Sequence, residues 1–149
     1  MDTIEFYPHV VSRLNDLLRR ERAAVEACDQ ALPRLRDEPT LSAVWRIRED
    51  HRAAVAVLEN EVRLAGGWPD GVSGSWGAFA RFFEGVARWL GQTGPLRGLL
   101  QGEEFGAARY DRIRQDDRLP QEVRAVIRDD LLPVTREHVR ALKGLIGIR

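Results

Sequence analysis

The sequence predicts an all-α protein: a four-helix bundle in which two helix hairpins are joined by a long, partly helical connection. Apolar residues recur at intervals of three and four residues along four long runs, a spacing typical of amphipathic helices. No window alternates apolar and polar residues for long enough to indicate a strand. Prolines lie at the starts of the runs and a glycine pair follows one of them, as at helix ends. The expected helices cover residues 9–32, 40–65, 96–117 and 121–146, with a shorter one over 74–91.

The first two runs show the helical spacing most clearly. In the first, one stripe joins Val11, Leu14, Leu18, Glu21, Val25, Cys28 and Leu32. In the second, which Pro39 opens and Gly66–Gly67 ends, the stripe is equally regular. It joins Leu41, Val44, Arg48, His51, Val55, Leu58, Val62 and Ala65. Such a stripe is the face that a helix turns toward its neighbours in a bundle. We therefore expect these two helices to pack against each other as a hairpin.

The third and fourth runs repeat the first two. Leu17–Glu21 aligns with Leu99–Glu103 at an offset of 82 residues, and Arg48–His51 aligns with Thr135–His138 at an offset of 87. The fourth run contains Pro133, which is expected to bend its helix. The repeat predicts a second hairpin that is related to the first by approximate symmetry.

The connection between the two hairpins is long and rich in aromatic residues. In the single domain that we expect, residues 66–95 join the hairpins 9–65 and 96–146. The aromatic stripe has two interpretations. Either it packs on its own chain and caps the bundle, or part of it forms a homodimer surface, since aromatic residues are favoured at interfaces. The residues of that surface would be Trp76, Phe79, Phe82, Phe83 and Trp89.

Composition and charge argue against several classes of function. The chain has 149 residues with 23 basic and 23 acidic side chains, so it lacks the excess positive charge by which proteins bind nucleic acids. Its one cysteine, Cys28, excludes an internal disulfide and a multi-cysteine zinc site. No apolar run is long enough to cross a membrane, and the first residues do not resemble a secretory signal. We therefore expect a cytoplasmic protein with neither nucleic-acid nor membrane partners.

Four polar residues interrupt the apolar stripes, one in each long helix: Glu21, His51, Glu103 and His138. They lie at matching heights in the two hairpins. A carboxylate in an apolar interior is costly unless it is neutralised, paired or bound to a metal. Four such residues at one level therefore indicate a site, and carboxylates with imidazoles suit iron, manganese or zinc. Glu104 takes the place of Glu103 if the third helix is rotated by about 100°.

With these residues on these helices, the sequence resembles the ferritin-like superfamily, which includes the rubrerythrins and bacterioferritins. The Gly-Gly-x-Pro turn and the aromatic connection are similar to those of small bacterial members of unassigned function. The resemblance implies that the first and third helices each supply a glutamate, here Glu21 and Glu103. It also implies a Glu-x-x-His pair on the second and fourth helices, whose histidines match His51 and His138. In the family these six residues hold two metal ions.

The match to the family is incomplete, because Arg48 and Thr135 occupy the positions of the two bridging glutamates. Too few carboxylates remain to neutralise two divalent ions, so a di-iron centre is not expected. In one interpretation, Arg48 replaces the metal and bridges Glu21 and Glu103, while the two histidines complete a buried hydrogen-bond network. The protein would then need no cofactor and would act, without enzymatic activity, through its surface as a homo-oligomer.

In the other interpretation, all four stripe residues bind a single iron, manganese or zinc ion, and Arg48 points away from them. The protein would then be an oxidoreductase or a metal-handling protein. Tyr110, one heptad after Glu103, is placed to hydrogen-bond a carboxylate of the site in either case. The direction of the Arg48 side chain separates the two interpretations.

Overall fold

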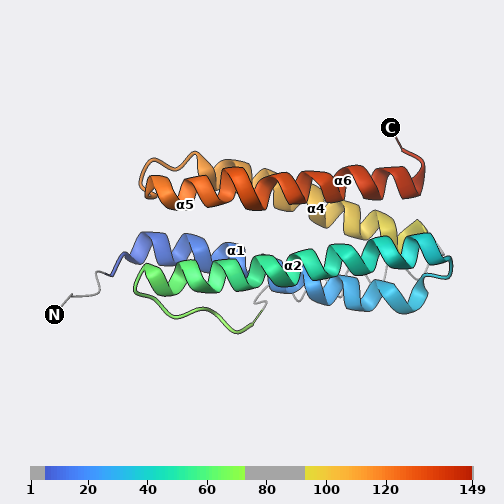
Figure 1. The fold of residues 1–149 in the computed structure, drawn as a ribbon, viewed down its shortest axis with the longest axis horizontal. Coiled ribbons are helices and arrows are strands. Elements are labelled where there is room, and N and C mark those ends of the chain that lie inside the picture. The colour runs from blue at the N-terminus through green and yellow to red at the C-terminus, as the bar shows by residue number, and fades with distance from the viewer. Residues whose placement is uncertain (1–5, 73–92, 149) are drawn as a thin grey trace.

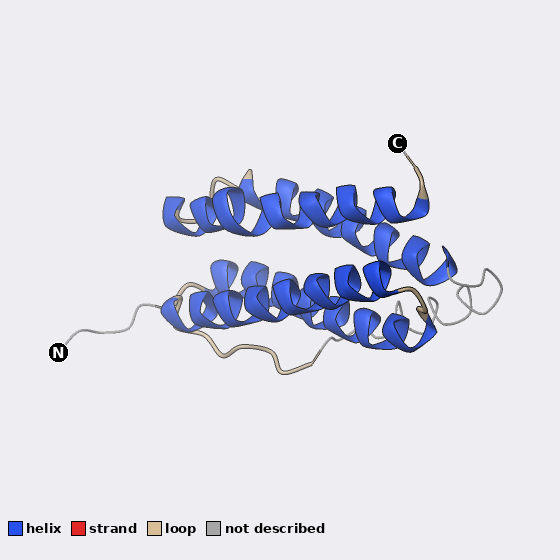
Figure 2. Ribbon diagram, turned by 45° about the vertical axis from the view of Figure 1, so that its right-hand side comes forward, coloured by secondary structure: helices blue, strands red, loops and turns tan. Residues whose placement is uncertain are grey.

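The computed structural model describes residues 6–72 and 93–148, most of which are helical (Figure 1). The elements are α1 (Pro8–Ala31), the 3₁₀ turn η1 (Leu32–Arg34), α2 (Glu38–Leu64), α4 (Thr93–Arg114), α5 (Gln121–Val126), the π-helical turn η2 (Ile127–Leu131) and α6 (Leu132–Ile146). The described residues contain no strand (Figure 2), which confirms the all-α prediction for this part of the chain. None of the described helices is both long enough and apolar enough to span a membrane.

The four long helices begin and end within three residues of their predicted bounds. The second begins two residues early because the Asp37 side chain caps it, accepting a hydrogen bond from the Thr40 backbone N at 3.0 Å. The third ends three residues early because the chain turns around Asp116, whose carboxylate accepts from the Arg118 backbone N at 3.0 Å. Gly66, with φ of 83°, ends the second helix as predicted.

The helices pair into the two predicted hairpins, which lie side by side (Figures 1 and 2). In one hairpin α1 packs on α2, and in the other α4 packs on the continuous α5–η2–α6 helix. Across the hairpins α1 contacts α4, and α2 contacts α6. The helix predicted over 74–91 falls outside the described residues, and so does the aromatic surface of Trp76, Phe79, Phe82, Phe83 and Trp89. The homodimer surface therefore stays a prediction.

The bend expected near Pro133 takes the form of the π-helical turn η2. Proline has no N–H to donate, and its ring crowds the carbonyl four residues earlier. In η2 the Leu132 N–H bonds to the Ile127 carbonyl, five residues back, so the turn is wider than in an α-helix. Pro133 then lies in the first turn of α6, where a missing N–H is tolerated. The helix therefore continues past the proline.

The core consists of two apolar clusters with a polar layer between them. Leu14, Leu18 and Leu58 belong to the first cluster, and Cys28 and Val44 belong to the second. The buried polar side chains between them are Glu21, His51, Glu103, Thr135 and His138. Each fully buried leucine contributes about 1.5–3 kcal/mol of hydrophobic stabilisation, so the clusters hold the helices in position on both sides of the polar layer.

Candidate metal centre

The four polar residues predicted from the stripes lie together in the interior. Their exposed fractions are 5% for Glu21, 4% for His51, 5% for Glu103 and 4% for His138, and they come from α1, α2, α4 and α6. Glu104, the alternative to Glu103, is exposed. The helical spacing therefore identified both the level of the centre and the rotation of each helix.

His51 lies between the two glutamates. Its Nδ1 bonds to Glu21 Oε2 at 2.5 Å and its Nε2 to Glu103 Oε1 at 2.5 Å. With both carboxylates ionised, both nitrogens must donate, which requires a doubly protonated, positively charged ring. Burial opposes this charge, but the charges and hydrogen bonds of Glu103 and Glu21 outweigh it and raise the pKa of His51 well above 6.5. Without metal, the centre therefore holds an imidazolium between two carboxylates.

His138 lies in the same arrangement on the other side of Glu103. Its Nδ1 lies 3.4 Å from Glu103 Oε2, and its Nε2 bonds to Asp50 Oδ2 at 2.9 Å. Burial lowers the pKa of His138, but the hydrogen bond and charge of Glu103, with the bond to Asp50, raise it above 6.5. Burial likewise raises the pKa of Glu103, but the charge of His51 and the hydrogen bonds of both histidines lower it to about 2. The protonated ring of His138 therefore balances the negative charge of the carboxylates on this side of the centre too.

Tyr110 completes the hydrogen bonding of Glu21, as its position one heptad after Glu103 suggested. Its hydroxyl donates to Glu21 Oε1 at 2.5 Å. Burial and the charge of Glu21 raise the pKa of Tyr110 well above 10, so the phenol keeps its proton. Both oxygens of Glu21 are therefore engaged, one by Tyr110 and one by His51.

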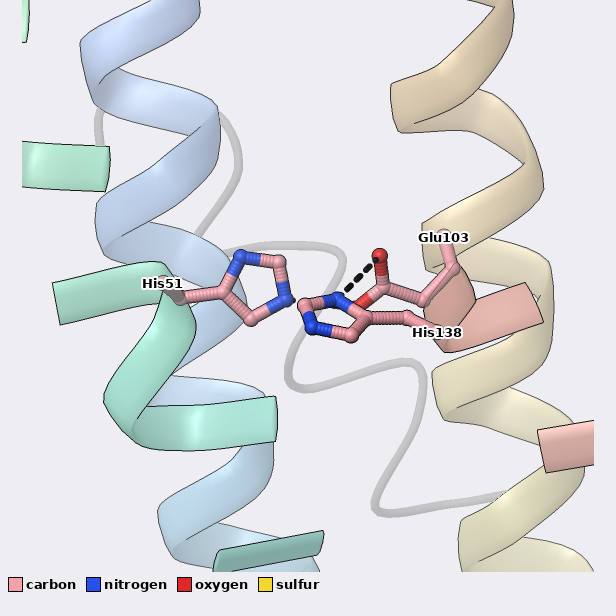
Figure 3. A group of neighbouring side chains, drawn as sticks. All are labelled: His51, Glu103 and His138. Atoms are coloured by element: carbon pink, nitrogen blue, oxygen red, sulfur yellow. Dashed lines mark hydrogen bonds and ion pairs between the residues drawn. The ribbon is translucent and has the colours of Figure 1, made fainter. Parts of the chain in front are cut away.

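Three of the side chains could share one metal ion. One ligand atom each from His51, Glu103 and His138 lies within 4.8 Å of the others, and Figure 3 shows the side chains pointing toward one another from three helices. Each histidine holds a carboxylate with its other nitrogen, His51 holding Glu21 and His138 holding Asp50. Metal-bound histidines are usually oriented in this way by an outer carboxylate or carbonyl. Glu21, expected from the sequence to be a ligand, is not one of these three side chains; it bonds to His51 Nδ1 instead.

The Arg48 side chain lies outside the centre, so the interpretation in which it bridges Glu21 and Glu103 is wrong. Its guanidinium pairs with Asp29 on α1 and with Glu49 at 3.2 Å. It also packs over the Trp45 ring, 5.1 Å from the centroid. The physical reason is that partly exposed carboxylates neutralise a guanidinium without the cost of burying it. The protonated ring of His51 takes the place between the glutamates instead.

Asp50 is the residue of the centre that sequence reasoning missed. It directly precedes His51, about 100° around the helix from the stripe, and its side chain is 42% exposed. The only sequence signal was that an acidic residue stands directly before each of the two histidines, Asp50 before His51 and Glu137 before His138. Thr135, whose hydroxyl donates to the Leu131 carbonyl at 3.1 Å, does not bond to the centre.

A small apolar cavity adjoins the centre between α1 and α4. Its volume is about 50 Å³, and it reaches Glu21, His51, Glu103 and Tyr110. Its other walls include the small residues Ala23, Ala24, Ala27, Gly98, Gly102 and Gly106. This volume is enough for a few water molecules. The centre therefore has free space beside it for a water ligand or a small uncharged molecule.

The chain matches no protein-family model, no curated protein and no solved structure. Its fold and its centre are therefore interpreted from their own residues. They define an all-α protein with a buried centre of two histidines and two glutamates.

Proposed function

We propose that this protein is a ferritin-like four-helix-bundle protein that binds a single divalent transition-metal ion through His51, Glu103 and His138. The observation that carries the proposal is the convergence of these three side chains within 4.8 Å in the interior, each histidine being oriented by a second carboxylate. Imidazole and carboxylate ligands suit iron, manganese and zinc. The direction of Arg48 supports the same conclusion, because its positive charge is neutralised outside the centre.

The charge of the centre favours one ion rather than two. Without metal, Glu21 and Glu103 carry two negative charges, and the rings of His51 and His138 carry two positive charges. If each histidine releases the proton that faces Glu103, from His51 Nε2 and His138 Nδ1, the centre loses two positive charges, which one divalent ion restores. A second ion would add two more positive charges, of which Asp50, the carboxylate bonded to His138, offsets only one, and positive charge left in the interior is costly.

The proposed function is metal handling or redox catalysis. A bound iron or manganese ion supplies redox chemistry, and a bound zinc ion supplies a Lewis acid. The chain's own residues bind the ion and exclude bulk water. Glu21 and Asp50 hold the outer nitrogens of the two histidines, so each ring keeps its orientation when its other proton leaves. The cavity of about 50 Å³ beside the centre leaves room for a small substrate or a water molecule.

Metal analysis with histidine variants tests this proposal. We expect protein purified without a histidine tag or chelator to take up one iron(II) ion per chain in an anaerobic titration, with the metal content checked by elemental analysis. His51→Ala and His138→Ala should lose this stoichiometric binding, because each removes one of three ligands. The matched control is His9→Ala, since His9 is the third histidine of the chain and bonds to Asp116 rather than to the centre.

Two outcomes of this experiment would contradict the proposal. The first is a wild-type protein that binds no iron(II), manganese(II) or zinc(II) under any condition, which would mean that the centre is a purely structural network. The second is stoichiometric binding that both centre variants retain, which would place the ion elsewhere.

A further inference from the structure

A second cavity reaches the same centre from the opposite side, between α2 and α6. Its volume is about 170 Å³, and its inner wall includes Glu21, His51 and His138. Asp50 and Asp130 also line it. The side chain of Asp50 is 42% exposed, and Asp130 is exposed. We refer to this cavity as the α2–α6 groove. It connects exposed carboxylates with the two histidines of the centre.

Small side chains and the π-helical turn shape the α2–α6 groove. On α2 its wall carries Ala53 and Ala54, which occupy little volume. On the other side, Asp130 belongs to η2 and Thr135 to the first turns of α6. Thr135 is small and bonds to its own helix. It thus leaves open space where the ferritin-like resemblance places a glutamate.

The charges of the α2–α6 groove favour a cation. Its described lining includes the carboxylates of Glu21, Asp50 and Asp130 and no lysine or arginine, although the chain has 23 basic residues. The charged rings of His51 and His138 form its inner wall, where Glu21 and Asp50 hold them by hydrogen bonds. The cavity between α1 and α4 differs, because its walls are mainly apolar and Arg20 is among them. The exposed part of the groove's lining, with Asp130 and the partly exposed Asp50, therefore carries negative charge, which raises the local concentration of cations and their rate of association.

The two neighbouring aspartates of η2, Asp129 and Asp130, differ in whether an arginine already pairs with their carboxylates. Asp129 pairs with Arg128, whose Nε donates to Asp129 Oδ1 at 2.8 Å, and it does not line the groove. Asp130 lines the groove. Among the described residues, no hydrogen bond or ion pair engages its carboxylate. Asp130 is therefore available to an incoming cation.

We propose that divalent cations reach the centre through the α2–α6 groove and that Asp130 captures them at its outer end. This inference rests on the proposed function, and it adds the route of entry and the residue that controls the rate. Asp50 also lines the groove and bonds to His138 Nε2 at 2.9 Å, so it brings negative charge next to a ligand. Because Asp130 is not a ligand of the centre, it should affect how fast the ion enters more than how tightly it is held.

Stopped-flow loading of the metal-free protein with Co²⁺, followed by the visible absorption of the bound ion, tests the route. For Asp130→Lys we expect the association rate constant to fall about tenfold at low ionic strength, with the dissociation constant changed less than twofold. Asp129→Lys makes the same charge change one residue away and should slow loading much less. The difference between the two variants should shrink as salt is added, because exposed charges are screened.

A second pair of variants tests the route by volume instead of charge. Ala53→Phe introduces a large side chain at an exposed position in the groove, and Ala56→Phe does so at an exposed position on the same helix, outside it. We expect slower Co²⁺ loading in Ala53→Phe only. Equal loading rates within each pair would overturn the route but leave the proposed function standing. A wild-type protein that takes up no Co²⁺ would overturn the proposed function and the route with it.

Discussion

Replacing His51 with alanine in the metal-free protein is expected to lower the free energy of unfolding by about 3–5 kcal/mol at pH 7, the cost of removing one partner from a buried charged pair. In the variant, the carboxylates of Glu21 and Glu103 stay in the interior but lose the imidazolium of His51, which lies between them in the wild type. Urea denaturation of the wild type and the variant measures the difference. Acidification should reduce it, because protonated carboxylates no longer need a positive partner.

Two further variants separate the loss of the charge from the loss of packing. His9→Ala, outside the centre, should change the free energy of unfolding far less. The triple variant Glu21→Gln/His51→Leu/Glu103→Gln removes both carboxylates with the imidazole and should be more stable than His51→Ala, because no unpaired charge remains buried. A loss below about 1 kcal/mol in His51→Ala, the range of an exposed pair, would show that the charges at the centre are not arranged as described.

The affinity for a divalent ion is expected to rise steeply with pH. The pKa values of His51 and His138 are both raised above 6.5 in the folded protein, so below pH 6.5 both rings are doubly protonated. Each must release one proton to bind the ion. The release of two protons makes the association constant rise by about a hundredfold per pH unit. As the pH passes the raised pKa values, the protons are already lost and the slope falls toward zero.

Zinc titrations in a competing chelator of known affinity, at pH 5.5, 6.0 and 6.5, measure this slope. The His9→Ala variant should show the same slope as the wild type, since His9 binds no ion. An association constant that does not change with pH over this range would contradict proton displacement at the two histidines.

Much of the fold followed from the spacing of apolar residues and from the prolines and glycines at the ends of the helices. The early end of α4 did not, because it depends on how Asp116 organises the following loop through Arg118. The π-helical turn was visible only as an expected bend at Pro133. Both details depend on local backbone geometry, at the loop after α4 and at the turn before Pro133, which the spacing of apolar residues does not specify.

For the candidate site, the positions of the four polar residues were predicted, but the direction of the Arg48 side chain was not. The stripes placed Glu21, His51, Glu103 and His138 at one level, because an α-helix repeats every 3.6 residues and the two hairpins match in length. The direction of the Arg48 side chain was not predictable, because a long side chain can reach several carboxylates around it. From the sequence, an arginine or a metal was expected to supply the positive charge between the glutamates; the hydrogen bonds of His51 to both glutamates instead indicate a protonated histidine there.

The most direct test of the central claim follows the ring protons of the three histidines by nitrogen-15 NMR as zinc is added. At one equivalent, we expect His51 to lose the proton on Nε2 and to keep that on Nδ1. His138 should do the reverse and keep the proton on Nε2, while His9 stays unchanged. If the signals of His51 and His138 do not respond to zinc, or if His51 instead loses the proton that it shares with Glu21, the ion does not bind at His51 Nε2 and His138 Nδ1 as proposed.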